Sequence, residues 1–483
     1  MNTIRLLIAL GALFCHDSLT LAQSTNTTAT PTYAAGACPT VLTPSYEAPV
    51  VGSGWTAQLI ATNLTKPRSI TFDQGGNLLV VQQGSGILRL SFTDHGGTCL
   101  VVNETKTVVE NSDLNHSIQV SADGGTLYAS TSDEVYRWPY DAVAGTVGCN
   151  ETLVTNMSNT DHVSRTLLLS QKVNNTLLVS RGSSENMDLV AAQLSSGHSQ
   201  VRSFDISSLP DGPYNYPTEG RRLGWGLRNS VGVAEHPVTG GIYAVENSAD
   251  EVVRNGTDIH EDNPGEEMNF LGYLNCSSTG GEGEGGNYGY PLCFALWKTD
   301  GFPGRGDMTV GSQFALKISD EFNDTTCAED YIPPRLTFQA HTAPLDILFN
   351  ADGSTAYVTF HGSWDRTNPA GYVLSSVEFD SSTGEPVAPP DSTHPTAADV
   401  LSNADLSRCP DGCFRPVGLA WDGQGRLFMS SDSTGEIYWD WDWDRDSECD
   451  SGWYDEWDGD VGDEYENEHE HVDFGGQPCA EVE

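Results

Sequence analysis

The feature that most constrains the fold is an internal repeat. Six segments share one pattern, in which a short hydrophobic strand, a turn rich in Gly, Asp and Asn, and a second hydrophobic strand are followed by small polar residues. Hydrophobic runs on both sides of a conformationally permissive turn predict a β-hairpin. The six segments are Thr71–Val81, Gln119–Ser130, Leu167–Ser180, Gly232–Val245, Ile347–Thr359 and Gly418–Ser430.

One hairpin cannot bury both of its faces, so recurring hairpins predict blades stacked around an axis. We therefore predict an all-β protein, a six-bladed β-propeller with long loops around an active site on its top face. A β-sandwich built from the same hairpins is the alternative, but it does not predict polar residues aligned between copies.

Charge and the N-terminal residues restrict the class of protein. The chain of 483 residues has 67 Asp+Glu against 23 Lys+Arg, a net charge of −44, which excludes a nucleic-acid-binding protein. Residues 1–22 combine Arg5, the apolar run Leu6–Phe14 and a small-residue cleavage site, and are predicted to be a signal peptide. No later apolar run is long enough to span a membrane. Ten cysteines and many Asn-X-Ser/Thr sequons remain, so we expect a secreted, extracellular glycoprotein with disulfides.

The predicted organisation has four parts. Residues 1–22 are the signal peptide, 23–49 an N-terminal extension, 50–440 the propeller and 441–483 an acidic tail. The alternation of aromatic and acidic residues over 439–444 is expected to finish the last strand of the last blade, and the rest of the tail to be disordered by its own charge repulsion. Cys409 and Cys413 are spaced to close a short loop.

Polar residues recur at equivalent places in the repeats. First strands start, and second strands end, at the same end of a propeller, so these residues predict a cationic funnel at one mouth of the axial channel. The alternative is that each is a solvated turn residue paired with a nearby carboxylate. The residues before first strands are Arg68, His116, Arg165, Asn229 and Arg415, and those after second strands are Gln83, Arg181, Asn247, Ser248, His361 and Asp432.

Five motifs occur in order along these repeats: Asp161-His162-Val163-Ser164-Arg165, Arg228-Asn229, Asn287-Tyr288-Gly289-Tyr290-Pro291, the stretch 361–366 (HGSWDR), and Phe414-Arg415-Pro416. The set resembles the glucose/sorbosone dehydrogenase superfamily, and within it the secreted fungal pyranose dehydrogenases that depend on pyrroloquinoline quinone (PQQ). The resemblance implies a six-bladed propeller that holds PQQ and calcium over the axial channel. It also implies oxidation of the anomeric carbon of pyranoses, such as L-fucose or D-glucosone, to a lactone or acid.

The resemblance also suggests which residues hold the cofactors. PQQ carries three carboxylates and an ortho-quinone, which suit cationic side chains and directional donors. Calcium would polarise the quinone, and the resemblance assigns it to the main-chain oxygens of Ser248 and Ala249. In bacterial relatives this turn is rich in Gly and Pro, unlike Val245–Ala249 here. The expected PQQ-binding residues are Arg68, His116, Arg228, Asn229, His361, Arg366 and Arg415.

His162 is the expected catalytic base. Oxidising a hemiacetal requires removal of the hydroxyl proton as hydride leaves carbon, and an imidazole with a pKa near 6.5 suits that task. The motif order suggests that Asp161 orients His162 or stabilises its protonated form. The acidic stretch 261–267 either forms a second, structural calcium site or is a solvated loop.

Electrons are expected to pass to an external acceptor, which would be a cytochrome domain, an oxidative polysaccharide-degrading enzyme or a quinone, because the chain has no C-x-x-C-H heme motif. We expect a monomer with a sugar substrate and no nucleic-acid or membrane partner. Two alternatives remain open: a calcium-dependent, lactonase-like propeller hydrolase, and a cofactor-free binding propeller.

Overall fold

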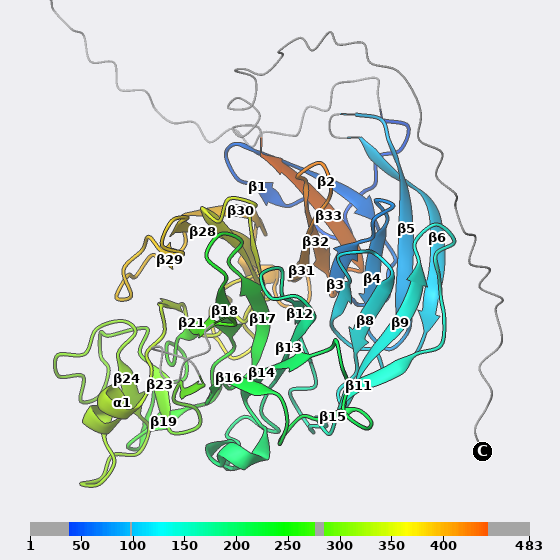
Figure 1. Cartoon of the computed structure of the whole chain (residues 1–483). Coiled ribbons are helices and arrows are strands. Elements are labelled where there is room, and N and C mark those ends of the chain that lie inside the picture. Colours follow the sequence, from blue (N-terminus) through cyan, green and yellow to red (C-terminus); the bar gives the residue numbers. More distant parts are fainter. Residues whose placement is uncertain (1–37, 97–98, 276–284, 443–483) are drawn as a thin grey trace, which may run out of the picture. The chain divides into compact units, whose positions relative to one another are not determined.

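The computed structural model describes residues 38–96, 99–275 and 285–442 (Figure 1). Nearly all regular elements of this part are strands, with one α-helix, α1 (Asp324–Asp330), and three short 3-10 helices, η1 (Leu189–Ala192), η2 (Leu194–Ser196) and η3 (Leu406–Arg408). None of these helices has the length and apolar character that crossing a membrane requires. The predicted signal peptide and most of the acidic tail lie outside the described residues.

Six antiparallel sheets form the blades, each with four principal strands. Listed from blade one to blade six, the first strands are β3 (Pro67–Phe72), β7 (Ile118–Val120), β12 (Leu167–Leu169), β17 (Ser230–Glu235), β26 (Pro344–Phe349) and β31 (Pro416–Trp421). The second strands are β4 (Leu78–Gln82), β8 (Thr126–Ser130), β13 (Thr176–Arg181), β18 (Gly241–Glu246), β27 (Thr355–Phe360) and β32 (Leu427–Ser431). The third strands are β5 (Gly86–Asp94), β9 (Val135–Asp141), β14 (Gln200–Asp205), β21 (Glu266–Tyr273), β28 (Val373–Asp380) and β33 (Glu436–Asp442). The fourth strands are β6 (Leu100–Glu110), β11 (Glu151–Thr155), β16 (Arg221–Trp225), β25 (Leu336–Phe338), β30 (Ala398–Ser402) and β2 (Trp55–Ala61).

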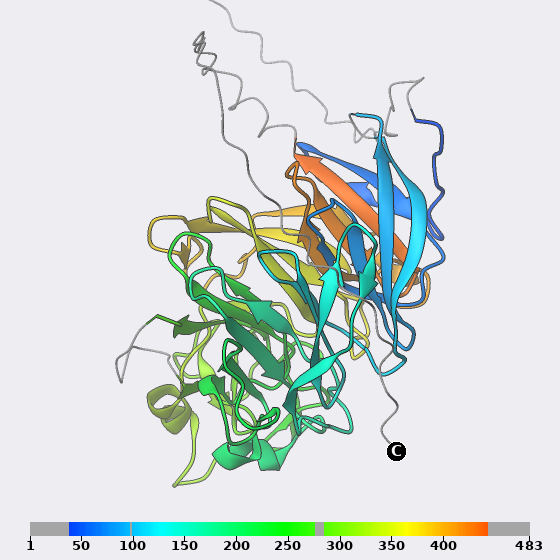
Figure 2. The same cartoon turned by 45° about the vertical axis from the view of Figure 1, so that its right-hand side comes forward.

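All six predicted hairpins are present. Each pairs the first and second strands of one blade in antiparallel register, for example Leu168 with Leu178 in blade three and Ile347 with Val358 in blade five. Each first strand contacts the first strand of the next blade, and β31 contacts β3, so the six inner strands close a ring. Figures 1 and 2 show the blades gathered around this ring. The predicted six-bladed propeller is confirmed.

The ring is closed by a strand from the N-terminal side. β2 pairs with β33, so the sixth blade joins residues far apart in the sequence. The alternating stretch after Trp439 continues β33 to Asp442, as predicted. Both faces of the second strands are buried, since each blade packs between two others; Leu78–Val81 of β4, for example, are fully buried. Smaller strands extend the blades: β1 (Val50–Val51), β10 (Thr146–Val147), β15 (Tyr214–Asn215), β22 (Gly286–Asn287) and β29 (Glu385–Pro386).

The long insertion between the fourth and fifth repeats has a structure of its own. It contains the two-stranded sheets β19 (Val253–Arg254) with β20 (Thr257–Asp258) and β23 (Cys293–Ala295) with β24 (Gln313–Ala315), followed by α1. Asn323 caps α1 by accepting from the backbone of Thr325 and Thr326, and a Cys293–Cys327 disulfide ties the helix to β23. Disulfides also join Cys38 to Cys99 and, as predicted, Cys409 to Cys413.

Candidate active site

Five of the predicted residues meet at one end of the inner strands. Arg68 of blade one donates to Asp432 at 2.6 Å and lies 3.3 Å from Nδ1 of His116 of blade two. The other oxygen of Asp432 lies 2.8 Å from Nε2 of His361, which follows β27. Arg415 in turn donates through Nε to the carbonyl of His361 at 3.0 Å. Strand starts and strand ends from blades one, two, five and six thus form one network at the mouth.

The charged groups in this network determine one another's protonation states. Burial alone would raise the pKa of Asp432, but His361 and Arg68 lower it overall, so the carboxylate stays ionised. Burial and the charge of Arg68 lower the pKa of His116 to about 3, so its imidazole is neutral near pH 7. The sequence predicted either a cationic funnel or solvated local pairs. The structure shows buried residues that are nonetheless paired.

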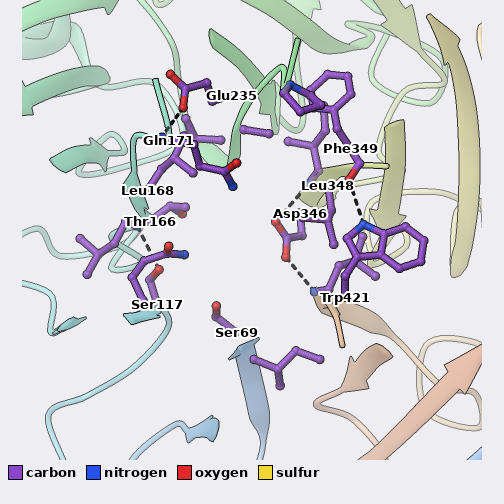
Figure 3. Close-up of a pocket in the computed structure, with 18 of the residues that line it drawn as sticks. Ser69, Ser117, Thr166, Leu168, Gln171, Glu235, Asp346, Leu348, Phe349 and Trp421 are labelled. Carbon is purple, nitrogen blue, oxygen red and sulfur yellow. Dashed lines mark hydrogen bonds between the residues drawn. The ribbon is translucent and has the colours of Figure 1, made fainter. Parts of the chain in front are cut away.

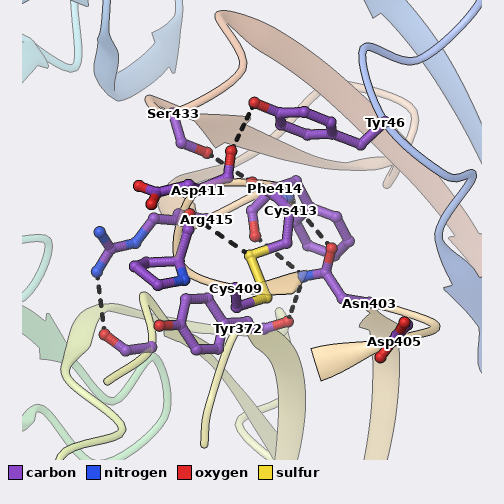
Figure 4. The surroundings of a disulfide bond; sticks show 12 residues. Tyr46, Tyr372, Asn403, Asp405, Cys409, Asp411, Cys413, Phe414, Arg415 and Ser433 are labelled. Carbon is purple, nitrogen blue, oxygen red and sulfur yellow. Dashed lines mark hydrogen bonds between the residues drawn. A yellow bond between two sulfur atoms is a disulfide. The ribbon is translucent and has the colours of Figure 1, made fainter. Parts of the chain in front are cut away.

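Arg415 is the cation of this group without a direct ion pair among the described residues. Its Nε and Nη2 donate to the carbonyls of His361 and Gly362, and its guanidinium lies over the ring of Tyr372, 5.5 Å from the centroid. Figure 4 shows the adjacent Cys409–Cys413 disulfide, which closes the loop before Arg415. This loop therefore presents Arg415 on a restrained backbone.

His162 is held by the loop of blade three that precedes β12. Arg165, fully buried, donates to the carbonyls of His162, Ser164 and Met157, and burial lowers its pKa to about 9. Asn159 donates to the His162 carbonyl at 3.1 Å and to that of Gly182 at 2.7 Å. The final Arg of the D-H-x-x-R motif thus shapes the loop from inside and does not reach the mouth.

The ring of His162 is oriented by Ser183. Nδ1 lies 2.8 Å from Ser183 Oγ and 3.2 Å from the Ser183 carbonyl. A carbonyl only accepts, so a proton on Nδ1 satisfies this contact and leaves Nε2, which makes no hydrogen bond to a described residue, as the basic nitrogen. Burial, and next the charge of Arg228, lower the pKa of His162 to about 4, while Asp161 opposes the shift. The imidazole is therefore neutral and able to accept a proton at pH 7.

Arg228 and Asn229 precede β17 and face the His162 loop. A side chain at Gly182 would meet Asn229 Oδ1 at 2.5 Å and His162 Cβ at 2.7 Å, so only glycine lets these two residues approach. Arg228 donates to Asn186, to the carbonyl of Asn247 and, at 3.1 Å, to Asp250. The Arg228 side chain is only 3% exposed. In this structure it therefore holds the surrounding loops together.

The turn after β18 carries the predicted calcium ligands. Its backbone is tied by Ser248 N–H to Glu266 at 2.6 Å and by Asn247 N–H to the carbonyl of Asn229 at 3.1 Å. Within the described residues, no hydrogen bond reaches the carbonyl oxygens of Ser248 and Ala249. Two unpaired carbonyls on a fixed turn are compatible with calcium, which accepts main-chain oxygens.

Two predicted residues lie apart from these groups. Arg366 donates to Asn368 and to the Glu261–Asp262 loop, 3.4 Å from Asp262, so that loop engages its guanidinium. Asp161 is exposed and acts on His162 through its charge, whereas the hydrogen bonds at Nδ1 come from Ser183.

Sequence reasoning missed the supporting residues of the blade three and four side. Ser183, Asn159 and Asn186 belong to no recognisable motif. Each supports the site through a hydrogen bond within the loops: Ser183 and Asn159 to His162, and Asn186 to Arg228. His341 lies 3.2 Å from Asp250 and 4.0 Å from Asp365, and these three could in principle hold a metal. Of these three residues, only Asp365 lies in a motif of the sequence, the stretch 361–366.

Beneath the mouth lies an axial cavity of about 420 Å³, lined by residues of all six inner strands. His116 lines it, which connects the cavity to the network described above. Figure 3 shows Asp346 projecting from one wall, opposite Thr166 and Ser117. Asp346 accepts from the backbone of Ile347 and Leu419, and burial raises its pKa to about 7.

Comparison with known proteins identifies the family. Residues 49–439 match the TrAA12-like family. The chain belongs to this family. It is 52% identical over 400 residues to a PQQ-dependent sugar dehydrogenase of Hypocrea jecorina (strain QM6a), over 82% of this chain and 89% of that protein. It is 36% identical over 416 residues to a PQQ-dependent pyranose dehydrogenase of Coprinopsis cinerea, over 83% of this chain but only 55% of that longer protein.

Solved structures agree with this assignment. A calcium structure of a Trichoderma reesei enzyme of carbohydrate-active enzyme family AA12 is 51% identical, with a TM-score of 0.80 over 84% of this chain and 100% of that one. The holo PQQ domain of the C. cinerea pyranose dehydrogenase is 34% identical, with a TM-score of 0.78 over 83% of this chain and 99% of that one. The predicted resemblance is confirmed, and this TrAA12-like chain belongs to a family of oxidoreductases.

Proposed function

We propose that this chain is a PQQ- and calcium-dependent dehydrogenase that oxidises the anomeric carbon of pyranoses to a lactone or acid. The observation that carries the proposal is the placement of His162, whose Nε2 makes no hydrogen bond to a described residue, at the same end of the propeller as the Arg68–Asp432–His361 network. A hydrolase would also use a neutral, oriented imidazole, but the arginines and histidines of the network suit an anionic cofactor and not a calcium ion alone.

The residues present fit the cofactor. PQQ is a tricarboxylate, and Arg415, which has no direct ion pair among the described residues, and Arg68 offer guanidinium groups to it. Asn229 of blade four and His116 of blade two add polar groups. Calcium would be held by the carbonyls of Ser248 and Ala249. Bound there, PQQ would supply the hydride-accepting carbon, and calcium would polarise it.

The protein's own contribution is proton transfer and orientation. Nε2 of His162 would take the proton from the C1 hydroxyl of the sugar, and the Ser183 contact to Nδ1 would keep the ring turned toward it. Arg228, His361 and Asp161 would contribute through charge and orientation, and a direct contact from Arg366 to PQQ would require Arg366 to leave Asp262.

The finer assignments belong to the same proposal. L-fucose or D-glucosone are the suggested substrates. The enzyme would act outside the cell as a monomer and pass electrons to a separate cytochrome domain, oxidative polysaccharide-degrading enzyme or quinone.

The test is spectroscopic. Purified protein is incubated with PQQ and calcium, desalted, and exposed anaerobically to a panel of sugars. Retained quinone absorbance that bleaches with a pyranose supports the proposal. If no PQQ is retained after desalting, the hydrolase or the binding-module reading replaces it, and a lactone or ester panel separates these two.

A further inference from the structure

One buried polar cluster of blade four plays no part in the proposed reaction. Glu246, at the end of β18, and Glu267, on β21, are directly opposite one another in the antiparallel register. Each is 3% exposed. Asn269, fully buried on the same face of β21, donates through Nδ2 to Glu246 Oε2 at 3.4 Å and to Glu267 Oε2 at 3.0 Å. Two carboxylates therefore converge on one amide inside the protein.

Three oxygens around this cluster have no hydrogen-bonding partner among the described residues: Asn269 Oδ1, Thr337 Oγ1 and Gln313 Oε1. Thr337 is the partner of Glu267 across the β21–β25 pair. Gln313 is the partner of Ala295, whose backbone hydrogen-bonds to Glu267. Buried acceptors without donors are rare, so three of them beside two carboxylates indicate that this region lacks positive charge.

The nearest cation does not neutralise the pair. The backbone N–H of Arg228 donates to Glu246 at 2.8 Å, but the Arg228 guanidinium is engaged by Asn186 and Asp250. Burial raises the pKa of Glu267 to about 7. Buried carboxylates are normally paired or bind a metal, and among the described residues no cationic side chain pairs with these two.

We propose that Glu246, Glu267 and Asn269 bind a hard divalent cation such as Ca²⁺ inside blade four, at a site separate from Ser248 and Ala249. A half-turn of the Asn269 amide, whose N and O are nearly equal in size, replaces Nδ2 by Oδ1 between the two carboxylates. That orientation is repulsive without a cation and favourable with one. Two carboxylates balance a charge of +2, and the hydroxyl of Thr337, directly opposite Glu267 in the register, extends the all-oxygen donor set that calcium prefers.

The site is distinct from the turn that follows β18. Glu266, a third buried glutamate of blade four, points toward that turn, where it accepts from the backbone of Ser248 and Ala343. For Glu266 and Glu267, the interpretation of the stretch 261–267 as a solvated loop is wrong, since both side chains are buried. For Glu267, the proposal corresponds to the alternative of a second, structural calcium site.

The test counts calcium. Chelated protein is re-equilibrated with Ca²⁺, desalted and analysed for metal per chain, with and without PQQ, alongside a calcium titration of thermal unfolding. We expect Glu267→Gln to hold one Ca²⁺ fewer than the parent chain in both states. We also expect that at least 100-fold more calcium is needed to raise the unfolding temperature of the variant. Because the count is a difference that does not need PQQ, failure of the proposed function leaves it interpretable.

Two further variants decide the outcome. Asp440→Asn removes a buried carboxylate whose oxygens have no hydrogen-bond partner among the described residues, on β33 of blade six, and should leave the calcium count unchanged. Asn269→Ala removes the amide at the centre of the cluster and should also hold one Ca²⁺ fewer, which provides a test if Glu267→Gln does not fold. A parental calcium count in whichever of Glu267→Gln and Asn269→Ala folds would overturn the proposal and favour a carboxylate pair that shares a proton.

Discussion

The two sides of the mouth are built in different ways. On the side of blades one, two, five and six, side chains contact side chains: Arg68, Asp432 and His361 form a direct chain of ion pairs. On the side of blades three and four, most side chains donate hydrogen bonds to backbone carbonyls. Arg165 holds the His162 loop through three such bonds. The first side depends on charge balance and the second on the shape of loops.

This contrast separates two kinds of mutational effect. Removing a charge on the first side leaves a buried partner charge unpaired, which costs stability and cofactor binding together. Removing a guanidinium on the second side leaves carbonyls unsatisfied and moves a catalytic group, which costs turnover more than binding.

The largest expected effect is that of Arg68→Met. It leaves Asp432 buried beside His361 with one cation fewer, and breaking a buried pair in this way costs about 3–5 kcal/mol. We expect a lower unfolding temperature and PQQ affinity weakened by about 100-fold or more, measured by calorimetry and by titration of PQQ absorbance.

The double variant Arg68→Met/Asp432→Asn sharpens this prediction. It should recover much of the lost stability, since the unpaired carboxylate is gone, but not the lost PQQ affinity. Recovery of both would mean that Arg68 serves only to neutralise Asp432.

Next in size is Arg165→Met, on the blade three side. Three carbonyls lose their bond to this guanidinium, and the His162 carbonyl keeps only the weaker hold of Asn159. We expect kcat to fall about 10- to 100-fold with KM for sugar changed little, because a displacement of about 1 Å can cost about 100-fold. Arg202→Met is the matched control, since this buried arginine also donates to carbonyls but in the outer part of blade three. An equal fall in kcat in both variants would contradict a positioning role for Arg165.

The pH profile should reflect the same side of the mouth. The base must be neutral to accept a proton, and the pKa of His162 is lowered to about 4. Accordingly kcat/KM should stay level from about pH 8 down to pH 5 and fall about tenfold per unit below pH 4. If kcat/KM instead fell with a midpoint near the ordinary histidine pKa of about 6.5, burial and Arg228 would not determine the pKa of His162.

Ser183→Ala should have the smallest effect. It removes the 2.8 Å contact to Nδ1 but keeps the backbone carbonyl at 3.2 Å as acceptor. We expect a fall in kcat of about 3- to 10-fold with PQQ affinity unchanged, in keeping with a neutral hydrogen bond of about 1 kcal/mol. Loss of PQQ in this variant would place Ser183 among the cofactor-binding residues.

How much the sequence could predict follows from the same contrast. Arg68, His116, His361 and Asp432 sit at equivalent places in a repeat, so strand order alone predicts that they meet, and they do. Ser183, Asn159 and Asp250 lie in loops without a repeat, where position depends on carbonyls that sequence does not display.

The buried cluster of blade four shows a second limit. Glu266 and Glu267 belong to an acidic run that is typical of a loop, yet they begin β21, which pairs with β18 and β25, and their side chains are buried. Charge density alone does not distinguish a solvated run from a central strand of a blade.

The most direct test of the account is the anaerobic reduction of bound PQQ by a pyranose in a single turnover, compared between the parent chain and His162→Ala. We expect the variant to retain quinone absorbance after desalting but to bleach about 10²- to 10⁴-fold more slowly, because a positioned base contributes that much. Bleaching at the parental rate in His162→Ala would contradict the account, since the imidazole would then have no part in taking the proton.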